Sequence, residues 1–231
     1  MNTDRNVKEA IDALEGIFLK HENLEYAKAQ AAYMKNHFPF YGIQSSLRKQ
    51  CFLVWKGEEV FKEIARDNLI QDLIRALWTC DQRDYQYIAI EIINGFNKNQ
   101  LQQEDIYLIK DLIVNKSWWD SVDAIASNIL GKYVLKFPEE GRKMLDEWSC
   151  SENLWLMRAT LIFQLKYRDK TDFELLKGYI LKYSSNKEFF IQKAIGWSLR
   201  QYSKTNPDVV SEFVKSVQLS NLAYREATKY L

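Results

Sequence analysis

The chain has 231 residues, with 32 Lys and Arg against 31 Asp and Glu, so its net charge is +1. Hydrophobic residues make up 47% and charged residues 27%, which is typical of a folded globular chain and excludes a disordered one. Only 8 Gly and 3 Pro accompany 7 Trp, 13 Tyr and 12 Phe. These are too few turn residues for a β-sandwich or a doubly wound sheet, so the composition predicts an all-α fold.

Apolar residues recur at helical spacing along almost the whole chain. The segments with this spacing are 4–19, 24–37, 45–55, 58–77, 83–97, 102–115, 118–136, 138–148, 152–167, 171–183, 187–203, 207–217 and 221–230. Asn94-Gly95 indicates a helix end, and Ser117 is the predicted N-cap of the helix that follows it. Pro138 and Pro207 stand where a helix can begin.

An internal repeat is visible in the second half of the chain. Residues 155–167 align with 190–202 at an offset of 35 (190 against 155), so that aromatic, basic, Ala and Tyr positions coincide. The stretch 84–89 is a third and fainter copy. A two-helix repeat of this length predicts a HEAT-like helical repeat solenoid, in which one helix of each pair lines a curved surface. We expect a single domain over 1–231.

Charge is distributed unevenly along the chain. Residues 1–115 carry 14 basic and 17 acidic side chains, a net −3, whereas 116–231 carry 18 and 14, a net +4. Within the second half, 151–231 carry 13 and 8, a net +5. The near-zero total excludes a generic polycationic coat for nucleic acid, but the basic C-terminal third is where an anionic partner is expected.

Few residues are available for a metal site or a disulfide framework. Cys51, Cys80 and Cys150 are far apart, and His21 and His37 complete no zinc-ligand spacing, so no metal or cofactor is expected. The first ten residues are charged and lack the apolar core of a signal peptide, and no run of about 18 apolar residues is present. These features predict a reduced protein of the cytoplasm that has no membrane partner.

The most unusual string is 115–123, which contains two adjacent Trp residues. Neighbours on a helix point about 100° apart, so at most one of Trp118 and Trp119 readily joins the core. Trp119 and Asp123 are four apart and share a helix face, where a carboxylate next to an indole suits a site better than a core. The alternative is that a Trp packs in the core and Asp123 pairs with a neighbouring Arg or Lys.

Arg158 and Trp197 lie in the two aligned helices, and Lys193 matches the position of Arg158. On a curved array, Trp119, Asp123, Arg158 and Trp197 would converge on one concave surface, although Trp is commonly core and an isolated Arg is commonly solvated. Basic side chains expected near that face are Lys166, Arg168, Lys170, Lys187, Lys193, Arg200 and Lys204. They suit phosphate binding, or equally a solvated surface.

The string 33–43 is rich in aromatic residues between two helices. Phe38, Phe40 and Tyr41 are expected to pack in a core corner, and His37 to be a structural hydrogen-bonding residue. The role of Tyr33 stays open at this point. Motifs of nucleotide-binding enzymes, α/β-hydrolases and zinc proteases are absent from the sequence.

Three strings together resemble the AlkD family of DNA alkylation-repair glycosylases, from about residue 25 to the C-terminus. They are 33–38 with Gly42-Ile43, 116–123 and 187–197, and the stretches 154–159 and 204–208 fit as well. The resemblance implies a HEAT-like α-solenoid whose concave, basic surface grips duplex DNA. It also implies hydrolysis of the N-glycosidic bond of N3- and N7-alkylated purines.

The resemblance assigns roles to particular residues. Trp119, Asp123 and Trp197 match the family's catalytic Trp, catalytic Asp and second active-site Trp. Arg158 matches an Arg expected to bind a phosphate, and Tyr33 matches a Tyr near the lesion. Lys193, Lys166 and Arg200 are the expected further DNA contacts.

The chemistry is consistent with these roles. An N3- or N7-alkylated purine is cationic and already a good leaving group, and its departure leaves positive charge on the deoxyribose, which Asp123 would stabilise while positioning water. This predicts a monofunctional, metal-free glycosylase for lesions such as 7-methylguanine and 3-methyladenine, acting as a monomer without base flipping. The alternative is a non-catalytic scaffold of the same fold that binds DNA or protein.

Overall fold

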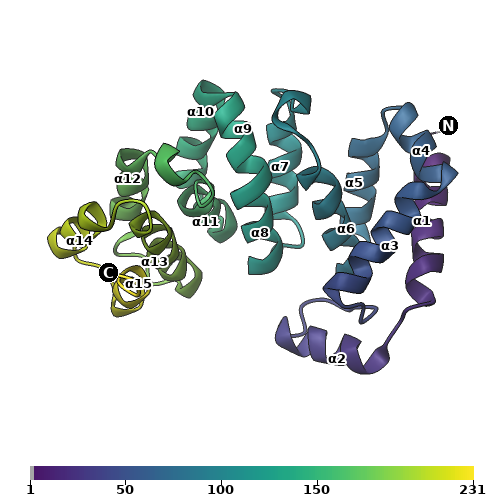
Figure 1. Ribbon diagram of the computed structural model, residues 1–231, viewed down its shortest axis with the longest axis horizontal. Helices are drawn as coiled ribbons and strands as arrows, with labels where there is room; N and C mark the ends of the chain where they lie inside the picture. The colour runs from purple at the N-terminus through teal and green to yellow at the C-terminus, as the bar shows by residue number, and fades with distance from the viewer. Residues whose placement is uncertain (1–2) are drawn as a thin grey trace. The chain divides into compact units, whose positions relative to one another are not determined.

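The computed structural model describes residues 3–231, and within that range the chain is helical with no strand (Figure 1). The predicted all-α fold is therefore confirmed. The contacts between residues divide the chain into two compact units, Met1–Gly95 and Phe96–Leu231. The single domain expected over 1–231 stays a prediction.

The first unit is built around a long N-terminal helix. Its elements are α1 (Thr3–Leu19), α2 (Leu24–Tyr33), α3 (Ser45–Gly57), α4 (Glu59–Arg66), α5 (Ile70–Thr79) and α6 (Arg83–Asn94). Helix α1 packs against α3, α4 and α5. Its apolar face buries Leu14 and Phe18, and the indole of the fully buried Trp55 donates to the Ala10 carbonyl at 2.8 Å. No residue of α2 is buried.

Two helices of the first unit end earlier than the periodicity predicts. The segment 58–77 is not one helix, because Asn68 has a φ of +58° and separates α4 from α5. Lys35 and Asn36, both at a φ of +57°, end α2 before 37. A left-handed residue cannot continue a right-handed helix, and hydrophobic spacing does not register it.

The corner after α2 is packed as expected. Phe40 and Tyr41 are buried, and the Tyr41 amide donates to the carboxylate of Asp84 at 2.9 Å. Phe38 is half-buried, with the Arg83 guanidinium 4.0 Å from its ring centre. Gly42 has a φ of +82°, and a Cβ there would lie 2.0 Å from the Asn23 carbonyl oxygen, so only glycine fits this approach to α2.

The second unit is a stack of helix pairs. Its elements are η1 (Lys98–Gln100), α7 (Asp105–Val114), α8 (Trp119–Ile125), the π-helical η2 (Ala126–Leu130), α9 (Gly131–Lys136), α10 (Pro138–Ser149), α11 (Leu154–Ile162), η3 (Arg168–Lys170), α12 (Phe173–Tyr183), α13 (Phe189–Ser203), α14 (Pro207–Ser216) and α15 (Asn221–Ala227). Helix α11 packs against α8 on one side and α13 on the other (Figure 1). Pro138 and Pro207 each open a helix, as predicted.

The repeat found in the sequence is present in the helices. Helices α8, α11 and α13 begin at Trp119, Leu154 and Phe189, so each start is 35 residues after the previous one (154 − 119 and 189 − 154). The two residues that the alignment matched, Trp155 and Phe190, are in contact, with ring centres 5.1 Å apart. The predicted helical repeat is thus confirmed, and it brings equivalent positions of successive pairs together.

Candidate active site

Helix α8 starts from a tight turn. Lys116 has a φ of +47°, a conformation that is sparsely populated for a residue other than glycine. The predicted N-cap, Ser117, is wrong by one position: the cap is Trp118, and the Ser117 hydroxyl instead donates to the Ile113 carbonyl at 2.6 Å. This turn joins α7 to α8, and the two helices pack against each other.

The two adjacent Trp residues separate as the sequence predicts. Trp118 packs edge-on against Trp155 and Phe190, with ring centres 5.7 and 5.2 Å away. Trp119 instead lines a surface pocket, which Asp123 also lines. Trp118 is therefore the packing residue of the pair.

A π-helical segment, Ala126–Leu130, begins three residues after Asp123. In this wider turn, the Asp123 and Ala124 carbonyls accept side-chain donors four residues ahead, from the Ser127 hydroxyl and the Asn128 amide, both at 2.7 Å. Single π turns inside α-helices occur often at functional sites. Here the segment follows α8 and precedes α9 in one continuous helical run.

Asp123 is held by a two-pronged ion pair. Arg158 donates from Nε to one carboxylate oxygen at 2.7 Å and from Nη2 to the other at 2.9 Å. Its remaining nitrogen, Nη1, donates to the Phe190 carbonyl. The side chains of Arg158 and Asp123 are only 5% and 15% exposed. Burial raises the pKa of Asp123, and the Arg158 guanidinium opposes that rise.

The repeat explains this pairing. Asp123, Arg158 and Lys193 are 35 residues apart in turn, so they occupy the same position on α8, α11 and α13. Equivalent positions on stacked helices are neighbours, and the opposite charges of Asp123 and Arg158 favour their contact. From the sequence, Arg158 matched Lys193, and an ion pair of Asp123 with a neighbouring Arg or Lys was only the alternative to a functional site; the structure shows that pair with Arg158.

One pocket of about 360 Å³ collects most of the predicted residues. Its walls are formed by Trp119, Asp123, Arg158, Phe189, Phe190, Lys193, Trp197, Arg200 and Glu226. The predicted Trp119, Asp123, Trp197, Arg158, Lys193 and Arg200 therefore lie together within the second unit. In this pocket the nearly enclosed carboxylate and the indole rings can stabilise a cationic centre, and the cations Lys193 and Arg200 can hold an anion next to it.

Glu226 of α15 lies in the pocket and was not predicted from the sequence. Its Oε1 accepts from the Lys193 ammonium at 2.9 Å, and its Oε2 accepts from Arg200 at 2.6 Å. Lys193 is the main cause that lowers the pKa of Glu226. The one signal in the sequence is Gly196 inside a helical pattern, since an isolated glycine there lowers helix stability and commonly has a packing reason.

Two predicted residues are not in this pocket. The ammonium of Lys166 is exposed and donates to the side-chain oxygen of Asn128. Tyr33 is the last residue of α2 in the other unit, and it is 69% exposed. Their roles stay predictions.

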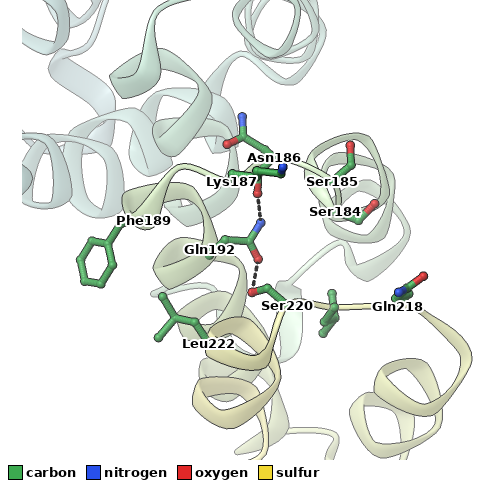
Figure 2. Close-up of a pocket in the computed structure, with 10 residues that line it drawn as sticks. Ser184, Ser185, Asn186, Lys187, Phe189, Gln192, Gln218, Ser220 and Leu222 are labelled. Atoms are coloured by element: carbon green, nitrogen blue, oxygen red, sulfur yellow. Dashed lines mark hydrogen bonds between the residues drawn. The ribbon is translucent and has the colours of Figure 1, made fainter.

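A second cavity, of about 620 Å³, lies at the start of α13 and is lined by Lys187 and several serine and amide side chains (Figure 2). Phe189 belongs to the walls of both cavities. Within residues 3–231, no group of three or more His, Cys, Asp or Glu residues could hold a metal ion. No helix in the same range combines the length and apolar character required to span a bilayer.

A family profile and a solved structure that resemble this chain carry the same description. The sequence profile of a family described as DNA alkylation repair enzyme matches residues 16–231. The chain is 38% identical to the solved structure of a predicted DNA alkylation repair enzyme from Enterococcus faecalis, with a TM-score of 0.81 over 91% of this chain and 96% of that one. No curated protein matches the chain.

More distant structures share the fold. AlkD2 from Streptococcus mutans is 19% identical, with a TM-score of 0.60 over 89% of this chain and 99% of that one. The protein smu.31 from Streptococcus mutans UA159 is 20% identical, with a TM-score of 0.58 over 80% and 91%.

Proposed function

This chain belongs to the family of DNA alkylation repair enzymes, and from that premise we propose that it is a monofunctional DNA glycosylase. Its proposed substrates are cationic N3- and N7-alkylpurines in duplex DNA, such as 7-methylguanine and 3-methyladenine. The proposal includes action as a monomer, in the cytoplasm, without a metal or cofactor. The alternative is a scaffold of the same fold that binds DNA or protein without catalysis.

The observation that carries the proposal is the Asp123 carboxylate, held by Arg158 in the same pocket as Trp119 and Trp197. Two contacts from a rigid guanidinium fix the orientation of the carboxylate before any substrate arrives. A fixed anion in a partly dehydrated site stabilises developing positive charge more strongly than one in water.

In the proposed reaction, the bond between C1′ and the purine nitrogen breaks, and its electron pair neutralises the positive charge of the base. The sugar is left with oxocarbenium-like charge, which Asp123 stabilises. A water molecule positioned by Asp123 then adds to C1′ and gives up a proton to the carboxylate or to solvent. The electron-rich faces of Trp119 and Trp197 favour the cationic nucleotide.

Arg158 is expected from the resemblance to bind a phosphate. Its Nε, Nη1 and Nη2 all donate within the protein, so in this proposal Arg158 holds Asp123 in place. The proposed contacts with the DNA backbone are then made by Lys193 and Arg200 in the pocket, and by Lys166 and Tyr33 outside it. Such contacts fix the register of the protein on the duplex.

The proposal also includes excision without base flipping, which the resemblance implies. Enzymes that flip the base extrude it from the helix into an active-site pocket. Here the alkylated purine would stay stacked in the duplex, while Trp119, Asp123 and Trp197 face its sugar and backbone.

Release of free base is the direct test. The protein is incubated with duplex DNA containing 7-methylguanine, and the free base is quantified by chromatography, with undamaged duplex as the control. The proposal predicts release of 7-methylguanine and an abasic duplex with intact strands. Salt-dependent duplex binding without release would support the scaffold, and absence of such binding would leave the protein-binding form of it.

A further inference from the structure

Glu226 joins two cations of the pocket through one carboxylate. Lys193 and Arg200 are seven residues apart on α13, so they lie about two turns apart on one face of that helix. Each oxygen of Glu226 accepts from one of them, at 2.9 and 2.6 Å. The Glu226 side chain is 18% exposed, against 38% for Lys193 and 22% for Arg200. The carboxylate thus lies beneath the two cations and holds both on the same face.

Gly196 lets α15 come close enough for this contact. A Cβ on Gly196 would lie 2.4 Å from the Cβ of Glu226 and 2.8 Å from the Ala223 carbonyl oxygen. Real Cβ atoms do not approach this closely, so any other residue would displace α15. Gly196 stands midway between Lys193 and Arg200 along α13, directly before Trp197. The glycine therefore permits the close packing of α15 against α13 beside the pocket.

A second contact fixes the start of α15 (Figure 2). The Ser220 hydroxyl donates to the Gln192 side chain at 2.5 Å and accepts the Ala223 amide at 3.1 Å as the helix cap. Gln192, which is buried, also donates to the Asn186 carbonyl in the turn before α13. Helix α15 is thus tied to α13 at its start by Ser220 and near its end by Glu226.

We propose that Glu226 is a positioning residue that presents Lys193 and Arg200 to two backbone phosphates of the DNA beside the lesion. This inference rests on the proposed function. Charge explains why a carboxylate is useful in a DNA-binding pocket. The walls carry three cations, Arg158, Lys193 and Arg200, against Asp123 and Glu226, a net +1. Without Glu226 the net is +2, and the two cations are free to follow any phosphate.

The Glu226→Gln variant separates a positioning role from a structural role, because the first predicts tighter binding of duplex DNA and the second predicts weaker binding. Undamaged duplex should bind several-fold more tightly to the variant. The slope of the logarithm of the binding constant against the logarithm of the salt concentration should become more negative by about 0.9 for each cation that is released. Excision of 7-methylguanine under saturating, single-turnover conditions should slow by about 10-fold or more, since the phosphates are no longer held in register. The matched control is Glu212→Gln on α14, an exposed site outside the pocket, which adds the same charge.

Tighter binding with slower excision in Glu226→Gln, but not in Glu212→Gln, supports the proposal. Weaker binding together with slower excision would overturn it in favour of a structural role, and wild-type values for both would overturn it outright. If the wild type releases no base, the proposed glycosylase function fails, while the affinity and salt dependence for undamaged duplex still decide the role of Glu226.

A shorter carboxylate provides a second variant if Glu226→Gln does not fold. Glu226→Asp keeps the charge but shortens the reach to Lys193 and Arg200. It should slow excision, because the shorter side chain no longer holds both cations in register. Excision at the wild-type rate by a folded Glu226→Asp protein would contradict the positioning role.

Discussion

Two groups of charged side chains line the pocket, and they differ in how much water reaches them. Arg158 and Asp123 are nearly enclosed, and burial raises the pKa of Asp123 despite its cationic partner. Glu226 with Lys193 and Arg200 is more open, and there the cations lower the pKa of the carboxylate. The same kind of ion pair is thus dominated by desolvation in one place and by attraction in the other.

This difference in exposure to water indicates the role to which each group is suited. A buried ion pair contributes little net stability but is costly to break, so the Asp123–Arg158 pair fixes one geometry. A partly exposed pair exchanges partners more easily, because water and DNA phosphates can replace the carboxylate. The first group fits the proposed chemistry and the second fits the proposed backbone contacts.

Removing one cation from each group should produce the largest difference in unfolding free energy between two variants. Arg158→Leu leaves Asp123 buried without its partner and should lower the free energy of unfolding by about 3–5 kcal/mol. Lys193→Leu, at the equivalent position of the next repeat, should lower it by about 1 kcal/mol or less. Urea unfolding followed by circular dichroism measures both. Equal losses in the two variants would remove the distinction between the groups.

The contact that places the second group can be tested at Gly196. Gly196→Ala forces a Cβ against Glu226 and Ala223 and should cost about 1–3 kcal/mol of unfolding free energy. Gly178→Ala on α12 is the matched control, since its Cβ would meet no atom within 4 Å. That substitution should stabilise the protein by about 0.5–1 kcal/mol. A Gly196→Ala protein as stable as wild type would show that α15 is not held closely on α13.

As the pH falls, the contributions of Glu226 and Asp123 to the free energy of unfolding should change in opposite directions. Of the predicted changes in stability, this one is the smallest. The folded pKa of Glu226 is below its unfolded value, so its contribution to stability is present above about pH 4.3 and is lost as the pH falls. The folded pKa of Asp123 is above its unfolded value, so its contribution is greatest in acid and is lost as the pH rises through the folded pKa.

Unfolding free energies between pH 3 and 7 test this difference in sign. The cost of Glu226→Gln relative to wild type should shrink as the pH falls, and the cost of Asp123→Asn should grow. The same trend in both variants would contradict the contrast between burial and pairing.

Much of the fold could be predicted from the sequence, because helical spacing and a 35-residue repeat are both local patterns. The repeat also placed Arg158 and Lys193 in equivalent positions, and the four-residue spacing put Trp119 and Asp123 on one face. Periodicity does not detect a left-handed residue, which is why the break at Asn68 between α4 and α5 was missed.

The rest of the site depends on contacts that no local pattern encodes. Glu226 is 33 residues from Lys193 and on a helix of its own, so its partners follow only from how closely α15 packs on α13. The Phe190 carbonyl that accepts from Arg158 is a backbone atom, which side-chain patterns cannot identify. Both parts of the site arise from packing between repeats.

Base release by Asp123→Asn tests the central claim most directly, because asparagine keeps the shape and one acceptor oxygen for Arg158 while it removes the negative charge. At saturating enzyme, with equal duplex binding and folding verified by circular dichroism, we predict that 7-methylguanine excision falls by about 10²–10³-fold. Asp169→Asn, an exposed carboxylate in η3, should excise at the wild-type rate. Excision by Asp123→Asn at the wild-type rate would contradict the assignment of Asp123 as the group that stabilises the positively charged sugar as the base departs.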